Sequence, residues 1–74
     1  MAEPIKYAAV IERCGDDYNA YVPDLRGCGA VGGSPEEVIA NVRKAIEIHI
    51  RSMREDGDPI PEPTSTAITV EVAA

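Results

Sequence analysis

The stretch from Tyr21 to Glu37 places the strongest limit on how this 74-residue chain can fold. Pro23 removes a backbone hydrogen-bond donor and therefore ends a strand. A turn and a short glycine-bounded apolar run follow. The sequence Ser-Pro-Glu-Glu at residues 34–37 then has the residue types of a helix start, with Ser34 as the capping residue. A strand end, a turn, a short strand and a helix start in this order predict a small α+β domain.

Alternating apolar residues predict an antiparallel three-stranded meander before the helix and one strand after it. The expected elements are strands over Ile5–Cys14, Tyr18–Val22 and Cys28–Val31, a helix from Ser34 to about Asp56, and a last strand over Ala67–Val72. Gly15, Asp16 and Asp17 form the first turn. Prolines at positions 59, 61 and 63 hold the chain extended before the last strand. The order β-β-β-α-β fits one domain over residues 1–74.

One helix covers only one face of a sheet. Its apolar stripe consists of Val38, Val42, Ala45, Ile46, His49 and Met53, widened by Ile39 and Ile50. The opposite sheet face would carry Ala8 and Val10, which are poorly suited to water. The chain also has no Phe and no Trp, so its core is small. We therefore expect a homo-oligomer, a dimer or tetramer, or a different protein that covers this face.

The net charge of −6 limits the classes of partner. Phosphate contacts need clustered Lys and Arg, so direct nucleic-acid binding is not expected. An acidic surface suits solubility or a basic partner. No apolar run approaches the roughly 20 residues of a membrane-spanning helix, and the N-terminus has no signal-peptide pattern. We expect a cytoplasmic protein with reduced thiols.

The residues that could carry chemistry do not assemble a catalytic or metal site. His49 is the only histidine and falls in mid-helix. A strand of roughly 17 Å separates Cys14 from Cys28, too far for a disulfide. Two cysteines and one histidine also fall short of four zinc ligands. The glycines lack the Gly-Lys-Ser/Thr of a phosphate loop. We expect no enzyme activity, no metal and no cofactor.

Acidic residues are numerous, and turn and cap roles explain most of them. A metal-dependent nuclease would need carboxylates that converge on a metal, which makes it the weakest alternative. The residues alone indicate an acidic, self-associating binding module. Four acids at strand ends and turns are candidates for partner contacts: Glu12, Asp16, Asp17 and Asp24.

The ordered set of motifs resembles the HicB-like antitoxin family over nearly the whole chain. The residues that carry the resemblance are Tyr7–Ile11, Gly-Asp-Asp-Tyr at 15–18, Ala-Tyr-Val-Pro-Asp-Leu at 20–25, Gly27-Cys28, Ser-Pro-Glu-Glu at 34–37, Ala45–His49, and Glu-Asp-Gly-Asp-Pro-Ile-Pro at 55–61. Arg26 departs from the pattern, because the family often has a second proline there.

The resemblance implies a partial ribonuclease-H-like fold without nuclease activity. It also implies an antitoxin of a type II toxin–antitoxin pair, which binds and occludes a small basic HicA-type toxin that cleaves RNA. The catalytic histidine of such a pair belongs to the toxin, so His49 inherits no role. Many members carry a C-terminal DNA-binding domain, whereas this chain stops at Ala74, so a short member without that domain is expected. The alternative is an orphan regulatory or small-ligand-binding homo-oligomer without a toxin partner.

Overall fold

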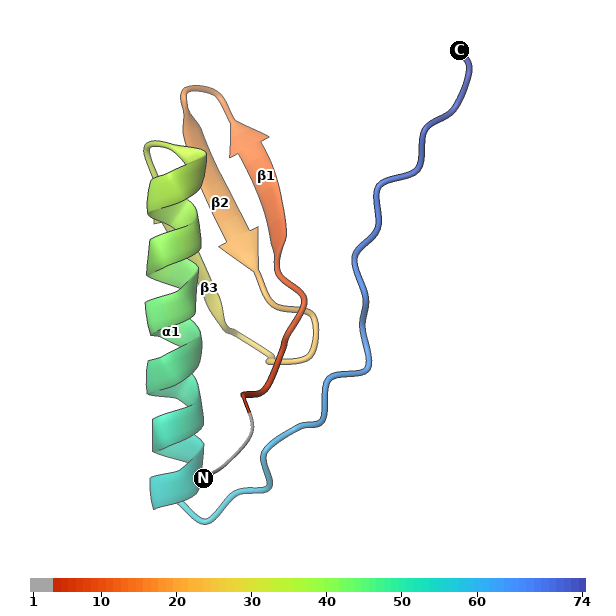
Figure 1. Cartoon of the computed structure of the whole chain (residues 1–74). Helices are drawn as coiled ribbons and strands as arrows, with labels where there is room; N and C mark the ends of the chain where they lie inside the picture. Colours follow the sequence, from red (N-terminus) through yellow and green to blue (C-terminus); the bar gives the residue numbers. More distant parts are fainter. Residues whose placement is uncertain (1–3) are drawn as a thin grey trace.

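A computed structural model describes residues 4–74 of the chain as a three-stranded antiparallel sheet with one helix on one face (Figure 1). The elements are β1 (Val10–Cys14), β2 (Asp17–Tyr21), β3 (Gly29–Gly32) and α1 (Pro35–Glu55). The strand order is β1-β2-β3. The helix packs mainly on β3 and β2, so β1 forms the less covered edge. The predicted α+β meander with a following helix is confirmed.

The strand β1 is shorter than predicted. Its ladder begins with Val10 opposite Tyr21, so the predicted start at Ile5 was wrong. The next residue of the partner strand, Val22, leaves the ladder and donates its N–H to the Cys28 carbonyl at 3.1 Å. Residues 5–9 therefore have no opposing strand, although Tyr7 and Ala9 still pack against the core. Strands β2 and β3 each lie one residue away from their predicted bounds.

The helix begins and ends as the sequence predicts. Ser34 is the N-cap with φ −151°, and its Oγ accepts a hydrogen bond from the Glu37 N–H at 3.1 Å. The reciprocal bond differs from the expected capping box, because Glu37 Oε1 accepts from the Gly33 N–H at 3.2 Å. At the other end, Gly57 takes φ 73°, the left-handed conformation that stops a helix.

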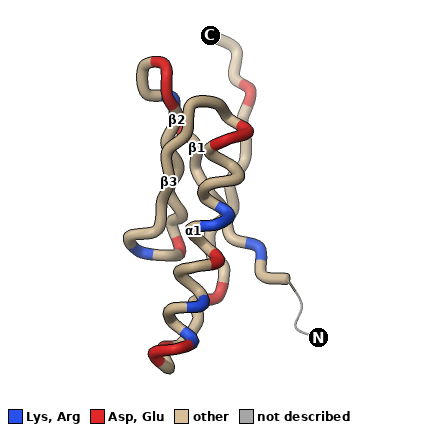
Figure 2. Tube along the Cα trace, turned by 90° about the vertical axis from the view of Figure 1, so that its left-hand side faces the viewer, with Lys and Arg blue, Asp and Glu red and all other residues tan. Residues whose placement is uncertain are grey.

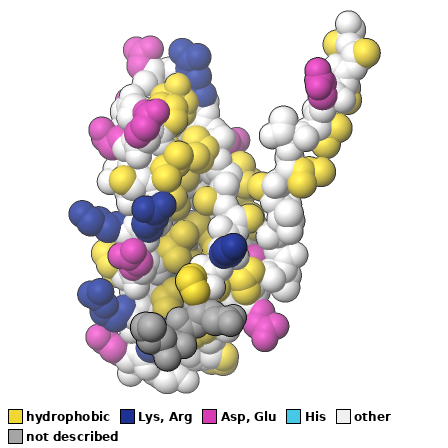
Figure 3. Space-filling view, viewed as in Figure 1, with side chains coloured by type: hydrophobic (Ala, Val, Ile, Leu, Met, Phe, Trp, Pro, Cys, Tyr) yellow, Lys and Arg dark blue, Asp and Glu magenta, His cyan; other side chains and the backbone are white. Residues whose placement is uncertain are grey.

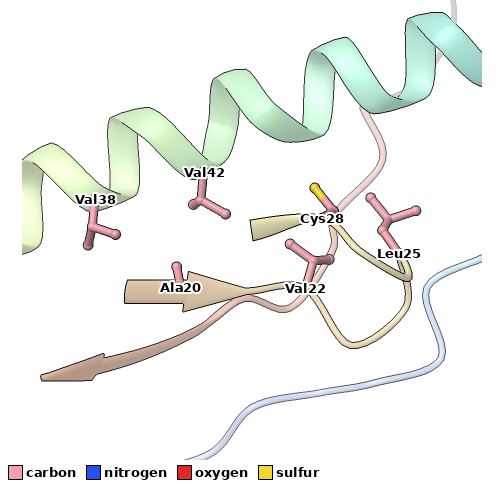
Figure 4. Packing of buried hydrophobic residues seen from close by; sticks show 6 residues of the cluster. All are labelled: Ala20, Val22, Leu25, Cys28, Val38 and Val42. Carbon is pink, nitrogen blue, oxygen red and sulfur yellow. The ribbon is translucent and has the colours of Figure 1, made fainter. Parts of the chain in front are cut away.

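The core lies between α1 and the sheet, and it extends into the loop after β2 (Figure 4). Its buried members are Ala20, Val22, Leu25, Cys28, Val38 and Val42. Leu25 is only 1% exposed, although it belongs to the loop that the sequence presents as a turn. Its N–H donates to the Val22 carbonyl, and Gly27 takes the predicted positive φ of 77°. This loop therefore supplies one of the most deeply buried side chains of the core.

The predicted last strand, Ala67–Val72, is not formed: within residues 4–74 this segment pairs with no strand. We call residues 66–74 the C-terminal arm. The arm leaves the body after Ser65 and runs outward beside the sheet (Figure 1). Hydrogen bonds from Thr64 and Ser65 to Asp24 fix the point of departure. The proline-spaced segment before it restricts the directions that the arm can take.

Candidate protein interface

The sheet face opposite α1 carries exposed apolar side chains. Ala20 is buried beneath the helix, so its strand neighbours Asn19 and Tyr21 point to the other face. The register places Tyr21 opposite Val10 and Asn19 opposite Val31. Tyr21 is 48% exposed and Val31 70% exposed. The centre of this face is therefore an accessible aromatic and aliphatic surface.

Acidic residues border this surface at the β1–β2 hairpin (Figure 2). Glu12 pairs with Asn19, and Asp17 pairs with Cys14. Strand alternation places both carboxylates on the same face as Asn19, and both residues are exposed. Asp16 lies in the turn between the two strands. We define the open sheet face as Val10, Glu12, Asp17, Asn19, Tyr21 and Val31.

A shallow depression continues this face around the edge of β3. Asp17 and Val31 line it from the sheet, and Glu37 and Asn41 line it from the helix. The Asn41 side-chain amide donates to the Val31 carbonyl at 2.8 Å, which ties the helix to the edge strand. From the sequence, Glu37 was predicted to act only in the helix cap. The direct passage from β3 into α1 was the signal that the first helical turn would also lie beside the hairpin.

Asp24 lies apart from the other three predicted contact acids. It follows β2 at the end of that strand opposite the hairpin, and it holds the segment that precedes the C-terminal arm. Its carboxylate accepts hydrogen bonds from the Thr64 N–H (3.0 Å), the Thr64 Oγ1 (2.8 Å), the Ser65 N–H (3.1 Å) and the Ser65 Oγ (3.1 Å). These bonds hold the pKa of Asp24 below its usual range, and the bond from the Ser65 backbone N–H makes the largest contribution.

The four predicted contacts thus divide into two groups. Glu12, Asp16 and Asp17 cluster at the hairpin with their side chains exposed. Asp24 fastens one part of the chain to another, so a contact between Asp24 and a partner would compete with this internal role. The contact role of all four stays a prediction.

The residues considered for chemistry are dispersed. Cys14 is a free, exposed thiol, whereas Cys28 is buried, and burial raises the pKa of its thiol. His49 is half-buried on α1. Across residues 4–74, no group of three or more His, Cys, Asp and Glu side chains is placed to hold a metal ion. In the same part of the chain, no helix combines the length and apolar character needed to cross a membrane.

Several curated proteins are similar to this chain in sequence. An uncharacterised 14.9 kDa protein from the rep-hol intergenic region of Haemophilus phage HP1 is 38% identical over 56 residues, which are 76% of this chain and 42% of the phage protein. A UPF0150 protein of Synechocystis is 37% identical over 76% of this chain and 72% of its own. A UPF0150 protein of Thermoplasma acidophilum is 33% identical over 89% of this chain and 97% of its own.

A solved structure and a family profile are also similar. A chain of the structure titled "HicA3 and HicB3 toxin-antitoxin complex" superposes with a TM-score of 0.69 at 27% identity, over 81% of this chain and 70% of that chain. The profile of the family described as "HicB_like antitoxin of bacterial toxin-antitoxin system" matches residues 7–73, which include the meander, the helix and all but the last residue of the arm. The chain therefore belongs to the HicB-like antitoxin family.

Proposed function

We propose that this chain is the antitoxin of a type II toxin–antitoxin pair, and that it binds and occludes a small basic HicA-type toxin that cleaves RNA. The observation that carries the proposal is the match of the antitoxin family profile over residues 7–73. Similarity to a chain of a toxin–antitoxin complex gives further support. The proposal includes a cytoplasmic location, no catalytic role for this chain, a partial ribonuclease-H-like fold and self-association.

The open sheet face has the composition of a protein-binding surface. Interfaces concentrate aromatic and aliphatic side chains at their centre and place polar groups around the rim. Tyr21 and Val31 supply an exposed apolar centre. Glu12 and Asp17 supply an acidic rim at the hairpin. We assign the toxin to this face, where the rim would steer a basic protein and fix its orientation.

The excess negative charge of the chain favours the same partner. The sequence carries 13 Asp and Glu against 7 Lys and Arg. A basic partner therefore experiences long-range attraction that raises its association rate and weakens as salt is added. If only the apolar side chains of the open sheet face contributed to binding, the affinity would not depend on salt in this way.

The test is binding to a small basic HicA-type protein, measured by titration calorimetry at two salt concentrations. Asp17→Lys places a repulsive charge on the rim, and Glu62→Lys makes the same charge change in the exposed proline-spaced segment. We expect Asp17→Lys to weaken binding at least tenfold and Glu62→Lys to weaken it less than threefold. Equal effects of the two variants would show that the toxin does not bind at the open sheet face. If the unaltered chain does not bind at all, the antitoxin proposal is overturned.

A further inference from the structure

The C-terminal arm exposes apolar side chains along one side. Ile68 is 78% exposed, Val70 67% and Val72 74%. Their spacing of two residues places all three on one side of an extended chain. Figure 1 shows the arm standing clear of the sheet and the helix. An apolar, strand-like segment with unpaired backbone groups is a template for strand pairing.

The edge of β1 offers a matching place. On its outer side, β1 pairs with no strand in the part of the chain that the structure describes. The other edge strand, β3, has only four residues, and Asn41 already donates to its Val31 carbonyl. Between α1 and the chain that leads into β1 runs a groove whose apolar lining is Ile5, Tyr7, Ile39, Val42 and Ile46, with Arg43 and Glu47 of the helix also lining it. Figure 3 shows hydrophobic side chains exposed between the helix and the sheet.

This groove is an incompletely covered side of the core. Ile5 is 44% exposed and Ile39 43% exposed, although both line it. Ile11 of β1, whose cross-strand partner Ala20 is buried beneath the helix, is 39% exposed. A fourth, apolar strand laid along β1 would shield all three isoleucines from water, and burial of apolar surface favours such a contact.

The arm has the length and the starting point that this place requires. The Tyr7 hydroxyl donates to the Pro61 carbonyl at 2.5 Å, so the segment before the arm passes the beginning of the β1 edge. From Ser65 to Val72 and from Tyr7 to Cys14 the chain advances by the same number of residues. At the usual rise, either stretch spans roughly 23 Å. A strand formed by the arm would therefore cover the edge and the groove together.

We propose that the arm of one chain pairs with β1 of a second copy and inserts Ile68 and Val70 over its groove, in a reciprocal exchange. The segment before the arm passes the start of its own β1, but beyond the hydrogen bonds to Asp24 the arm stands clear of that strand (Figure 1). Because a proline-rich segment is a semi-rigid, extended spacer, it opposes the change of direction that would lay the arm back on its own β1, and it leaves the arm available to a second copy. Because both copies present the same arm and the same groove, a two-fold arrangement satisfies both at once.

This exchange is separate from the proposed toxin contact. The arm would occupy the β1 edge and the helix side of the sheet, whereas the open sheet face is on the other side. The exchanged dimer therefore leaves Tyr21 and Val31 accessible, and its existence does not depend on the antitoxin role.

The experiment measures the mass of the chain by light scattering and maps its contacts by isotope-filtered NMR on a mixture of labelled and unlabelled copies. We expect twice the 7.9 kDa mass of one chain and interchain contacts between the Val70 methyls and Ile11 or Ile39. Contacts of the arm with β1 of its own chain only, or with no strand, would overturn the proposal.

A matched pair of variants separates this exchange from any other mode of dimerisation. Val70→Asp places a charge on the inserted side of both arms, and Thr69→Asp places it on the opposite side of the neighbouring position. We expect Val70→Asp to weaken the dimer about tenfold for each arm, or roughly 100-fold in total, because each buried charge opposes one contact. Thr69→Asp should change the dimer dissociation constant less than threefold. A dimer that tolerates both changes equally would refute the exchange.

Discussion

Adjacent glycines at the end of β3 allow a sharp test of how the helix is seated on the sheet. A Cβ at Gly32 would lie 2.6 Å from the Val38 backbone nitrogen and 2.9 Å from its Cα. These are backbone atoms of α1, so no side-chain rotation can relieve the contact. A Cβ at Gly33 would meet nothing within 4 Å. Gly32→Ala is therefore the perturbation, and Gly33→Ala is its matched control.

The expected magnitude follows from these distances. Ordinary contact begins near 3.4 Å, so Gly32→Ala requires the strand and the helix to separate by most of an ångström. Forced expansion of a packed core costs about 1–3 kcal/mol, and the reduced freedom of the unfolded chain returns about 0.4–1 kcal/mol. We expect Gly32→Ala to lower the free energy of unfolding by about 1.3 kcal/mol. Gly33→Ala should leave it unchanged or raise it by up to about 1 kcal/mol.

Thermal unfolding followed by circular dichroism, at one protein concentration for all variants, measures both effects. For a domain of this size, 1 kcal/mol corresponds to about 4–8 °C in the melting temperature. Gly32→Ala should therefore melt about 5–10 °C below the unaltered chain. If both variants melt within 2 °C of each other, the close seating of α1 on β3 is refuted.

Three further perturbations test separate parts of the fold. Asp24→Asn should remove the low-pH transition of the Thr64 amide signal in NMR. Because the pKa of Asp24 is lowered in the folded chain, its stabilising bonds are complete above the unfolded-state pKa near 3.8 and are lost as the pH falls through the folded-state pKa. A Thr64 titration that is the same in the variant would contradict this assignment. Leu25→Ala should lower the free energy of unfolding, measured in urea, by about 2–4 kcal/mol, because the Leu25 side chain is only 1% exposed. The control Ile48→Ala changes a side chain that is 60% exposed and should alter this free energy by less than about 0.5 kcal/mol. Similar values for the two variants would place Leu25 outside the core. Ser34→Ala should cost about 1 kcal/mol in the same assay, since the Glu37 N–H loses its partner, and no loss would argue against this cap.

The elements that local chemistry determines could be predicted from the sequence. Ser34 and Pro35 specify the helix start, and Gly57 specifies its end, because each acts through its own backbone or its neighbours. The meander followed from alternation and from the turn at residues 15–17. Strand ends were less predictable, since the start of β1 depends on where Val22 leaves the opposite strand, which is a tertiary fact.

Two features depend on tertiary structure that no local pattern encodes: the bonds between Asp24 and Thr64, and the absence of pairing between the arm and the strands that the structure describes. Asp24 and Thr64 are 40 positions apart, and the sequence offers no period or motif that pairs them. The arm illustrates the reverse case: its alternation of Ile68, Val70 and Val72 predicts a strand, yet a strand forms only where a partner edge is within reach. The sequence therefore predicted that the arm can form a strand, but the edge with which it pairs depends on tertiary structure that the local pattern does not encode.

The most direct test of the proposed antitoxin role is whether this chain inhibits RNA cleavage by a HicA-type toxin. A fixed amount of that protein cleaves a labelled RNA while this chain is added in increasing amounts. We expect cleavage to fall to background near one chain per toxin. Asp17→Lys should shift the inhibition curve to at least tenfold higher concentration, and Glu62→Lys should shift it less than threefold. Undiminished cleavage at a large excess of this chain would contradict the antitoxin role.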